Sequence, residues 1–479
     1  MQVGDIFSVE IESLDQEGRG VAHRDGKVAF IEGALPGERV RYERRRNKAS
    51  YEIGRVVEVE RSSTLRAEPR CPHFGLGPGA CGGCSMQHLE PRAQIAIKQR
   101  VLEDSLWHLA RLRPQQVLRP VSGSPWRYRH RARLAVRDVQ KKGGVLVGFH
   151  ERASSFVADM RSCEVLPAHV SALLVPLRAL VASLSMRDRM PQIELAVSEK
   201  NGVRQTVLVF RVLKTLTASD HGQLLAFGAE HGVEIWQQPG GPETAASISA
   251  AQPDHLTLSL PEFGVTLPFG PTDFTQVNHQ VNDLLVARAI RLLAPEPNDF
   301  VVDFFCGLGN FTLPVATRAR RVLGIEGSAT LTRRAAAAAR TNGLEGRVRF
   351  EARNLFDWTA ADWDALVSQG GPIDRVLIDP PREGAAAIAQ ALAATTTPPK
   401  RVVYVSCNPA TLARDCGVLA REGGWQLRAA GIVDMFPHTS HVESIAVLEP
   451  GSGIECTEER SNPAAVRGGR EGPIQTPPA

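Results

Sequence analysis

The C-terminal half of the chain alternates short apolar runs with longer segments in which apolar residues recur every three or four positions. The short runs have the length of buried strands and lie at residues 300–304, 348–351, 375–378, 401–405, 427–433 and 444–449. The longer segments have helical periodicity and lie at residues 281–293, 329–341, 385–394 and 411–422. Strands that alternate with helices predict a doubly wound, mostly parallel α/β sheet of the Rossmann-like type.

The N-terminal half follows a different pattern. Residues 1 to about 60 read as short strands separated by glycine turns, which predicts a small OB-like barrel. A helix is expected over 92–111, and strand-like runs with one helical stretch near 168–184 predict a central α+β insert. We therefore expect four regions: a barrel (1–62), a central domain (63–265), the α/β domain (266–450) and a disordered tail (451–479).

Composition narrows the class of protein. A hydrophobic fraction of 43% and a charged fraction of 23% are ordinary for a globular protein, and neither a membrane span nor a signal peptide is visible. We expect a cytoplasmic protein with reduced thiols. The net charge is only +4, but basic clusters at 41–48 and 127–133 suit a phosphate backbone as well as they suit a solvated surface. Trp126 and Tyr128, within the second cluster, could stack on bases or pack in the core.

A glycine loop follows the first strand of the α/β sheet. Gly307 and Gly309 in the segment 303–310 let the backbone turn tightly and approach a ligand closely. The next strand ends in Glu326, which could hold two ribose hydroxyls or could be the acid of a helix N-terminus. A dinucleotide fingerprint would need glycine at position 312, which is threonine here, so the loop favours S-adenosylmethionine over NAD.

Cys407 ends the apolar run 401–406, and Asn408-Pro409 stop the strand. A thiol at the end of a strand is well placed to act as a nucleophile, although a lone cysteine is more often a small buried hydrophobe. The sequence Asp379-Pro380-Pro381-Arg382 ends another strand. An acid and an arginine there argue against methylation of an amine and favour a carbon target.

Four of the eight cysteines suggest a metal site. Cys81 and Cys84 have the spacing of a metal knuckle, Cys71 precedes them, and Cys163 follows after a long gap. Four thiolates can bind zinc or a [4Fe–4S] cluster, and the residues alone favour zinc.

Four motifs in order, FCGLGNFTLPVA, LIDPPREG, VSCNPATLARD and MFPHTSHVES, together resemble the bacterial RNA uracil-C5 methyltransferases. The segment GRGVAHRDGKVAFIEGALPGERV resembles the TRAM domain, an RNA-binding barrel. A TRAM domain together with a cysteine cluster is similar to the members of that family that act on 23S ribosomal RNA.

The resemblance implies a role for each matching residue. It implies a nucleophile at Cys407, a general base at Glu443, and a [4Fe–4S] cluster in place of zinc. The residues implied for S-adenosylmethionine are Gln276, Phe305, Asn310, Glu326, Asn354 and Asp379. The cluster ligands are Cys71, Cys81, Cys84 and Cys163, although Gly77–Ala80 lengthen the gap between the first two.

The implied reaction is covalent. A thiolate adds to uracil C6, the activated C5 accepts the methyl group, and a base removes the C5 proton. We expect a monomer that acts on a flipped or single-stranded uridine of 23S ribosomal RNA, with no membrane partner. The alternatives are the same chemistry on transfer RNA, a cytosine-C5 DNA methyltransferase, and a non-catalytic RNA-binding iron–sulfur protein.

Overall fold

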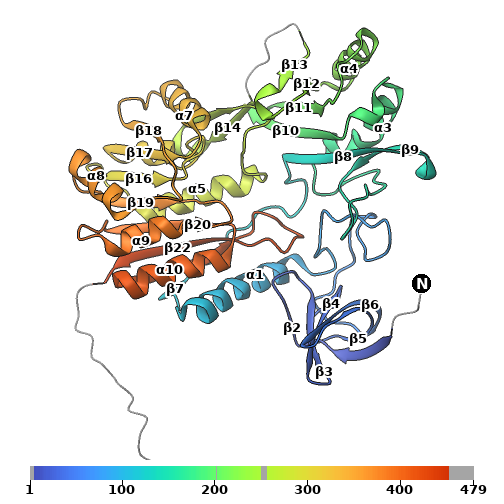
Figure 1. Cartoon of the computed structure of the whole chain (residues 1–479), viewed down its shortest axis with the longest axis horizontal. Coiled ribbons are helices and arrows are strands. Elements are labelled where there is room, and N and C mark those ends of the chain that lie inside the picture. The colour runs from blue at the N-terminus through green and yellow to red at the C-terminus, as the bar shows by residue number, and fades with distance from the viewer. Residues whose placement is uncertain (1–4, 201, 250–255, 452–479) are drawn as a thin grey trace, which may run out of the picture.

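The computed structural model describes residues 5–200, 202–249 and 256–451. The tail predicted to be disordered lies outside these residues, apart from Gly451. Across the described part of the chain, no helix combines the length and apolar character needed to cross a membrane. Three large sheets follow one another along the chain, and Figure 1 shows the N-terminal sheet set apart from the other two.

The N-terminal sheet confirms the expected OB-like arrangement of short strands. Its order is β1-β5-β6-β4-β3-β2, and inward-facing side chains that include Ile31, Val40 and Tyr42 form its core. The strands are β1 (Ile6–Glu10), β2 (Ser13–Leu14), β3 (Gly20–Arg24), β4 (Lys27–Glu32), β5 (Arg39–Asn47) and β6 (Tyr51–Arg61).

The central sheet has the order β13-β12-β11-β10-β8-β9. Its strands are β8 (Arg131–Val139), β9 (Gly144–Gly148), β10 (Gln192–Lys200), β11 (Val203–Arg211), β12 (Glu234–Gln238) and β13 (Ala246–Ser247). The associated helices are α2 (Ala168–Ala172), α3 (Leu174–Ser183) and α4 (Ala218–His231). Our expectation of a single helical stretch here was wrong. A further helix, α4, follows β11 and begins at a capping box formed by Thr217 and Asp220. A separate hairpin, β14 (Leu256–Leu260) and β15 (Val265–Phe269), leads to the C-terminal sheet.

The C-terminal sheet has eight strands in the order β18-β17-β16-β19-β20-β22-β21-β7. Its strands are β16 (Phe300–Phe304), β17 (Arg321–Glu326), β18 (Val348–Ala352), β19 (Arg375–Ile378), β20 (Arg401–Ser406), β21 (Trp425–Val433), β22 (Glu443–Pro450) and β7 (Gln116–Val117). The strands from β18 to β20 are parallel, and β22 runs antiparallel between β20 and β21. The doubly wound, mostly parallel sheet is confirmed.

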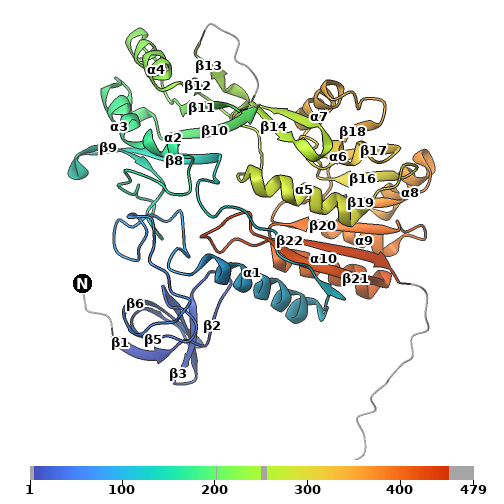
Figure 2. The same cartoon turned by 180° about the vertical axis from the view of Figure 1, so that it is seen from behind.

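Helices cover both faces of this sheet, as Figures 1 and 2 show from opposite sides. One face carries α5 (His279–Leu293), α6 (Thr312–Ala316) and α7 (Ala329–Thr341), and the other carries α8 (Ala360–Gly370), α9 (Ala386–Ala394) and α10 (Pro409–Gly423). Each face has its own apolar core, which explains why the central strands read as continuous apolar runs.

The helix expected over 92–111 forms as α1 (Pro91–Ser105) followed by a π-helical turn, Leu106–Ala110. It packs on the C-terminal sheet, because Leu102 and Leu106 are fully buried in the core against α10 and β21. Just beyond α1, the short strand β7 pairs in parallel with β21 at the edge of the same sheet. Residues of the N-terminal half thus complete the C-terminal sheet, and the four domain boundaries stay predictions.

Candidate active site and cysteine site

The candidate active site lies where the strand order of the C-terminal sheet reverses. β16 has β17 on one side and β19 on the other, so the loops after these strands diverge and leave room for a ligand at their carboxyl ends. Five predicted site residues follow strand ends at this edge: Phe305, Glu326, Asn354, Asp379 and Cys407.

The glycine loop after β16 is tied to Glu326. Gly307 and Gly309 have φ values of +53° and +91°, which glycine adopts without strain. The Gly307 amide donates to one Glu326 oxygen at 3.2 Å, and the Ser328 amide donates to the other at 3.0 Å. Each carboxylate oxygen keeps a lone pair, so Glu326 can still accept hydrogen bonds from a ribose.

Asn310 is held by a partner that the sequence did not indicate. Its side-chain amide donates to Asn282 Oδ1 at 2.9 Å, and the Asn282 amide donates to Asn310 Oδ1 at 3.0 Å. Asn282 is fully buried on α5. The reciprocal pair fixes the orientation of the Asn310 amide at the mouth of the glycine loop.

Aromatic side chains line the neighbouring loop. Phe305, at φ +63°, packs edge-to-face on Phe356 with ring centroids 5.8 Å apart. Phe356 is 53% exposed, and its amide donates to Asn354 Oδ1 at 3.1 Å. Asn354 is exposed and also hydrogen-bonds Asp357. An exposed ring beside the glycine loop offers an apolar surface to a flat ligand, and its place two residues after Asn354 was its only signal in the sequence.

Two carboxyl groups at the strand ends have raised pKa values. Asp303 is fully buried, and burial raises its pKa to about 8, while Thr312 Oγ1 donates to its Oδ2 at 2.5 Å. Desolvation raises the pKa of Asp379 to about 7. Asp379 follows β19 directly, and its amide donates to the carbonyl of Phe304 at 3.2 Å. Asp303 was not among the predicted site residues.

Cys407 and Glu443 are brought together by the register of β20 and β22. These antiparallel strands pair Ser406 with Ser444, and the Ser444 hydroxyl donates to the Ser406 carbonyl at 3.1 Å. Cys407 and Glu443 are the next pair along the two chains, and directly opposed residues of an antiparallel pair project from the same face. The two predicted catalytic residues, far apart in sequence, therefore stand opposite each other.

The electrostatics of this pair favour neutral forms. Burial, followed by the negative charges of Glu443 and Asp379, raises the pKa of the Cys407 thiol to about 11. Glu443 is 3% exposed, and burial together with Asp379 raises its pKa well above the ordinary value. Cys407 directly precedes the N-terminus of α10, where the helix dipole favours a thiolate. A cation bound nearby would lower the pKa values of Cys407, Asp379 and Glu443 and so favour their ionised forms.

Arg382 is the cation of the chain that faces this group, and it lowers the pKa of Cys407. The loop that carries it is fixed by α10, because Asn408 Nδ2 and Thr411 Oγ1 donate to the Arg382 carbonyl at 3.1 Å and 3.3 Å. Its guanidinium lies 3.4 Å from His441 Nδ1. Arg382 can therefore stabilise negative charge that develops beside the thiol.

Gln276 lies in the segment between β15 and α5. Asn278, two residues on, caps α5 and its amide lies 3.5 Å from the Met435 carbonyl. The Val277 carbonyl accepts from the His130 amide at 2.8 Å. These contacts connect the segment with β8 and with the loop before Glu443, but they give no direct contact between Gln276 and the strand-end residues.

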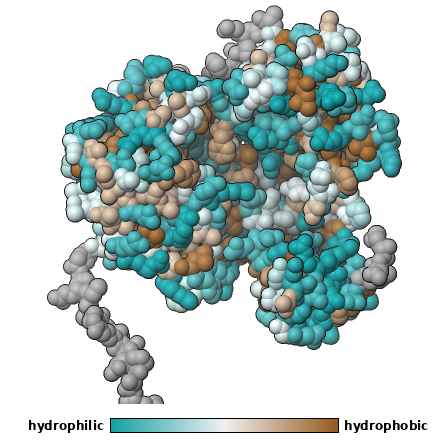
Figure 3. Space-filling model, in the orientation of Figure 1, coloured by the Kyte–Doolittle hydropathy of each residue, from teal (hydrophilic) through white to brown (hydrophobic). Residues whose placement is uncertain are grey.

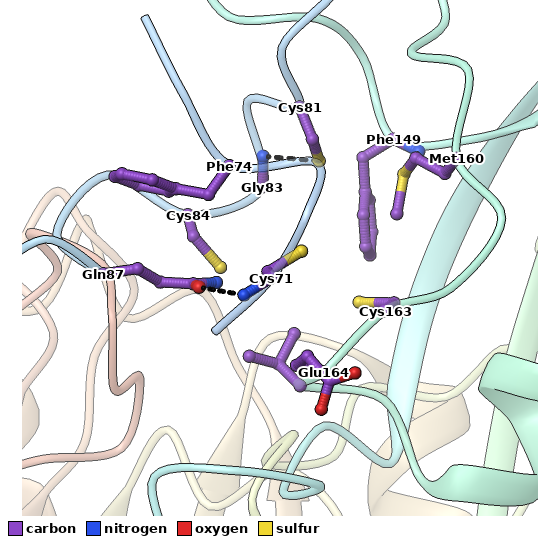
Figure 4. Close-up of a pocket in the computed structure, with 11 residues that line it drawn as sticks. Cys71, Phe74, Cys81, Gly83, Cys84, Gln87, Phe149, Met160, Cys163 and Glu164 are labelled. Atoms are coloured by element: carbon purple, nitrogen blue, oxygen red, sulfur yellow. Dashed lines mark hydrogen bonds between the residues drawn. The ribbon is translucent and has the colours of Figure 1, made fainter. Parts of the chain in front are cut away.

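The four predicted ligand cysteines line one hollow. All four are buried, with 5% to 9% of their surface exposed. Figure 4 shows the four sulfur atoms directed toward a common space, bordered by the Phe149 ring and Gln87. The added residues between Cys71 and Cys81 do not separate these two side chains, because the Cys81 amide donates back to the carbonyl of His73 at 2.9 Å.

A hydrogen bond reaches one of these sulfurs. The Gly83 amide donates to Cys81 Sγ at 3.3 Å. Such donors stabilise thiolates bound to iron–sulfur clusters.

The spacing of the thiols bears on the choice of metal. Over the described ranges, no group of three or more histidine, cysteine, aspartate or glutamate side chains lies close enough to hold a single metal ion. Four thiolates on one tetrahedral zinc, at about 2.3 Å each, would lie about 3.8 Å from one another.

The basic segments are largely paired with acids. Arg127 pairs with Glu164, whereas Arg131 and Arg133 share Glu194. Tyr128 is 4% exposed, so our suggestion that it could stack on bases was wrong. In the N-terminal sheet, Arg41, Arg44 and Arg45 also have acidic partners. Ion pairs for Arg46 and Lys48 are absent within the described residues, and both side chains are exposed.

Comparisons with known proteins agree with this geometry. Residues 269–450 match the family described as tRNA (Uracil-5-)-methyltransferase, and residues 1–41 match the TRAM domain. The chain is 59% identical to the 23S rRNA (uracil(1939)-C(5))-methyltransferase RlmD of Burkholderia ambifaria, over 92% of this chain and 95% of that protein. It is 58% identical to the RlmD protein of Burkholderia lata, over 92% and 94%.

A solved structure supports the fold. The tRNA (uracil-54, C5)-methyltransferase of Pyrococcus abyssi, in complex with S-adenosyl-L-homocysteine, superposes with a TM-score of 0.68 and 21% identity. The match covers 92% of this chain and all of that one. The likeness extends over all three sheets.

Proposed function

The chain belongs to the RNA uracil-C5 methyltransferase family, and on this premise we propose that it transfers a methyl group from S-adenosylmethionine to C5 of a uridine in 23S ribosomal RNA. One observation carries the proposal. The register of β20 and β22 puts a thiol and a buried carboxyl opposite each other at the ligand-binding edge of a methyltransferase sheet.

Cys407 is the proposed nucleophile. After loss of its proton, Sγ forms a bond to uracil C6, and the electrons of the C5–C6 double bond move toward O4 to give an enolate. C5 then attacks the sulfonium methyl group, and the methyl–sulfur bond breaks to release S-adenosylhomocysteine. Arg382 is the cation available to stabilise the enolate or the thiolate, and its effect on the Cys407 pKa supports that role.

Glu443 is the proposed base. Its carboxylate takes the proton from C5, the electrons of that C–H bond restore the C5–C6 double bond, and the Cys407 thiolate leaves C6. The products are 5-methyluridine, S-adenosylhomocysteine and one proton. Its burial and raised pKa support this role, because a more basic carboxylate accepts a proton from carbon more readily.

The methyl donor would be held at the switch point. Glu326 suits the ribose hydroxyls, and Phe305 with Phe356 suits the adenine ring. Asn310, Asn354, Asp379 and Gln276 complete the proposed set. Asp379 borders both the proposed methyl-donor site and the proposed catalytic pair, since its charge also acts on Cys407 and Glu443.

The cysteine site is proposed to hold a [4Fe–4S] cluster. Four buried cysteines that line one hollow, and the Gly83 amide that donates to Cys81 Sγ, support this proposal. Cys71, Cys81, Cys84 and Cys163 would be its ligands, and a cluster held by all four would join the segment 71–84 to the segment that follows β9.

RNA would approach the hydrophilic face of the N-terminal sheet, which Figure 3 displays beside a hollow between the two larger lobes. The free charges of Arg46 and Lys48 suit phosphate contacts. The target uridine must leave its stack to reach a thiol at a strand end. We propose a cytoplasmic monomer for this task.

The test is methylation in vitro of 23S ribosomal RNA that lacks the modification, with labelled S-adenosylmethionine and nucleoside analysis of the product. The proposal expects label in 5-methyluridine at one site. Label in transfer RNA alone would mean that transfer RNA is the substrate. Label in 5-methylcytosine would mean that cytosine is the methylated base. Absence of transfer together with absence of S-adenosylmethionine binding would favour a non-catalytic RNA-binding protein.

A further inference from the structure

The loop Asp434–Val442 connects β21 to β22 and ends at Glu443. Val433 pairs with Glu443 at the mouth of this loop, so the loop and the proposed base share one anchor in the sheet. In Figure 1 the loop leaves the C-terminal sheet and reaches toward the start of α1. The residues that hold the loop lie mainly in the N-terminal half of the chain.

His438 is the most constrained residue of the loop. It is 1% exposed and has a φ of +65°, an uncommon conformation for a residue other than glycine. Its carbonyl accepts from the amides of Ser85 and Met86 at 2.9 Å and 3.0 Å, and Ser85 Oγ accepts from the Ser440 amide at 3.1 Å. The loop is thus clamped to the two residues that follow Cys84.

The His438 ring is fixed by Gln94. The Gln94 Nε2 amide donates to the carbonyls of Met86 and Leu89 at 3.0 Å and 2.8 Å, and Gln94 Oε1 accepts from the His438 amide at 2.8 Å. Gln94 Nε2 also lies 3.1 Å from His438 Nδ1, so its two hydrogens are shared among three acceptors. Because an amide NH2 group cannot accept a hydrogen bond, Nδ1 faces it as an acceptor.

Three other side chains hold the rest of the loop. Trp126 stacks on the His438 ring with centroids 3.9 Å apart, and Tyr128 donates to the Pro437 carbonyl at 2.9 Å. Lys98, fully buried on α1, donates to Asp434 at 2.6 Å and to the Phe436 carbonyl at 2.9 Å. All three are buried or half-buried, which leaves the loop little freedom.

We propose that His438 is a positioning residue for Glu443, and that through it the segment following Cys84 sets the position of the proposed base. The inference rests on the proposed function. It differs from ordinary core packing, because a packing role requires only volume, whereas this role requires an acceptor at Nδ1 and a left-handed backbone. A shift of about 1 Å in a catalytic group can reduce the rate by about 100-fold.

Two substitutions separate these roles. His438→Phe keeps an aromatic ring against Trp126 and loses the acceptor for Gln94. His438→Asn loses most of the stacked surface but keeps an acceptor near the position of Nδ1, and asparagine tolerates the left-handed conformation. The matched control is His169→Phe, because His169 hydrogen-bonds Thr206 in the central sheet, away from this loop. Tyr128→Phe removes one tether of the loop while leaving His438 in place.

We expect His438→Phe to lower kcat by roughly 10- to 100-fold, with S-adenosylmethionine affinity within about twofold of wild type. A covalent protein–RNA adduct should accumulate, because the base acts after methyl transfer. His438→Asn should recover most of kcat, Tyr128→Phe should give a smaller loss with the same adduct, and His169→Phe should resemble wild type. Wild-type kcat for both His438→Phe and Tyr128→Phe would overturn the inference.

Hydrogen–deuterium exchange gives a readout that does not depend on turnover. The amides of Ser85, Met86 and Ser440 should exchange at least about tenfold faster in His438→Phe than in His438→Asn. Equal exchange in the two variants would contradict the clamp even if neither could be assayed. If the wild-type protein methylates no RNA, the proposed function fails independently of this comparison.

Discussion

The Ser444 hydroxyl donates a 3.1 Å hydrogen bond to the carbonyl oxygen of Ser406, across the last paired positions of two antiparallel strands. Both serines are fully buried, so the bond is shielded from water. It fixes the register at the point where the strands end. The residues just beyond it, Cys407 and Glu443, are the proposed nucleophile and base, and the pairing of the two strands brings them together.

Replacement of the nucleophile gives the most direct prediction. Cys407→Ala should reduce methyl transfer by about 1,000-fold or more, because no other group in the pair can add to C6. Binding of S-adenosylmethionine should persist in calorimetry. Cys416→Ala, a buried cysteine on α10, is the control and should retain transfer. Transfer by Cys407→Ala at the wild-type rate would refute the covalent route.

Removal of the base should stop the reaction one step later. Glu443→Gln keeps the size and buried position of the side chain but cannot accept the C5 proton, so turnover should fall by about 100- to 10,000-fold. The methylated RNA should stay attached to Cys407, visible as a shifted band on a denaturing gel. A variant that turns over slowly without any adduct would point to a different base.

The reciprocal amide pair of Asn282 and Asn310 should matter for cofactor binding. Asn282→Ala removes two hydrogen bonds that orient Asn310, and a cost of about 1 kcal/mol corresponds to roughly five- to tenfold weaker binding of S-adenosylmethionine. The control is Asn342→Ala at the C-terminus of α7, which breaks a similar amide pairing with the Thr266 backbone of β15. Equal affinities of Asn282→Ala and Asn342→Ala for S-adenosylmethionine would contradict a specific role of Asn282 in cofactor binding.

Asp303 should make stability depend on pH. Its pKa is raised to about 8 in the folded state, compared with about 3.9 in an unfolded chain, so the folded protein binds the proton more tightly. The stability it contributes is complete below pH 4 and is lost as the pH rises through 8. Asp303→Asn cannot ionise, so its melting temperature relative to wild type should increase between pH 6 and pH 9. A constant difference over this range would be inconsistent with the raised pKa.

The cysteine site predicts a specific metal content. Anaerobically purified protein should contain about four iron and four sulfide per chain. Cys84→Ser should lose most of both, whereas Cys416→Ala should keep them. One zinc per chain without sulfide would contradict the cluster and indicate a mononuclear zinc site.

The parts of the fold that the sequence predicted have strong local signals. Strand 300–304 matches β16, and strand 375–378 matches β19, because both are mainly apolar segments buried on two faces. The insertion of β22 between β20 and β21 has no local signal, since it depends on pairing across the whole sheet. Helix α4 was missed because its capping box lies before a segment of only moderate amphipathicity.

The same reasoning explains which site residues were found. Residues at strand ends, such as Glu326 and Cys407, are visible from the element pattern alone. Asn282 and His438 act through partners that are 28 and 344 positions away in sequence, so only the folded chain reveals them. The basic segment 127–133 looked more available to RNA in the sequence than it is in the structure, because three of its four arginines form ion pairs with Glu164 or Glu194.

The packing of α1 and β7 against the last strands has a consequence for how the protein is made. During synthesis Leu102 and Leu106 leave the ribosome long before β21 and α10, the elements that cover them. Until translation nears its end, this helix exposes an apolar face, and a holding chaperone or a transient contact must shield it. A nascent chain stalled before residue 400 would therefore bind such chaperones, and a gene fragment that starts at residue 266 would yield a sheet with an unprotected edge.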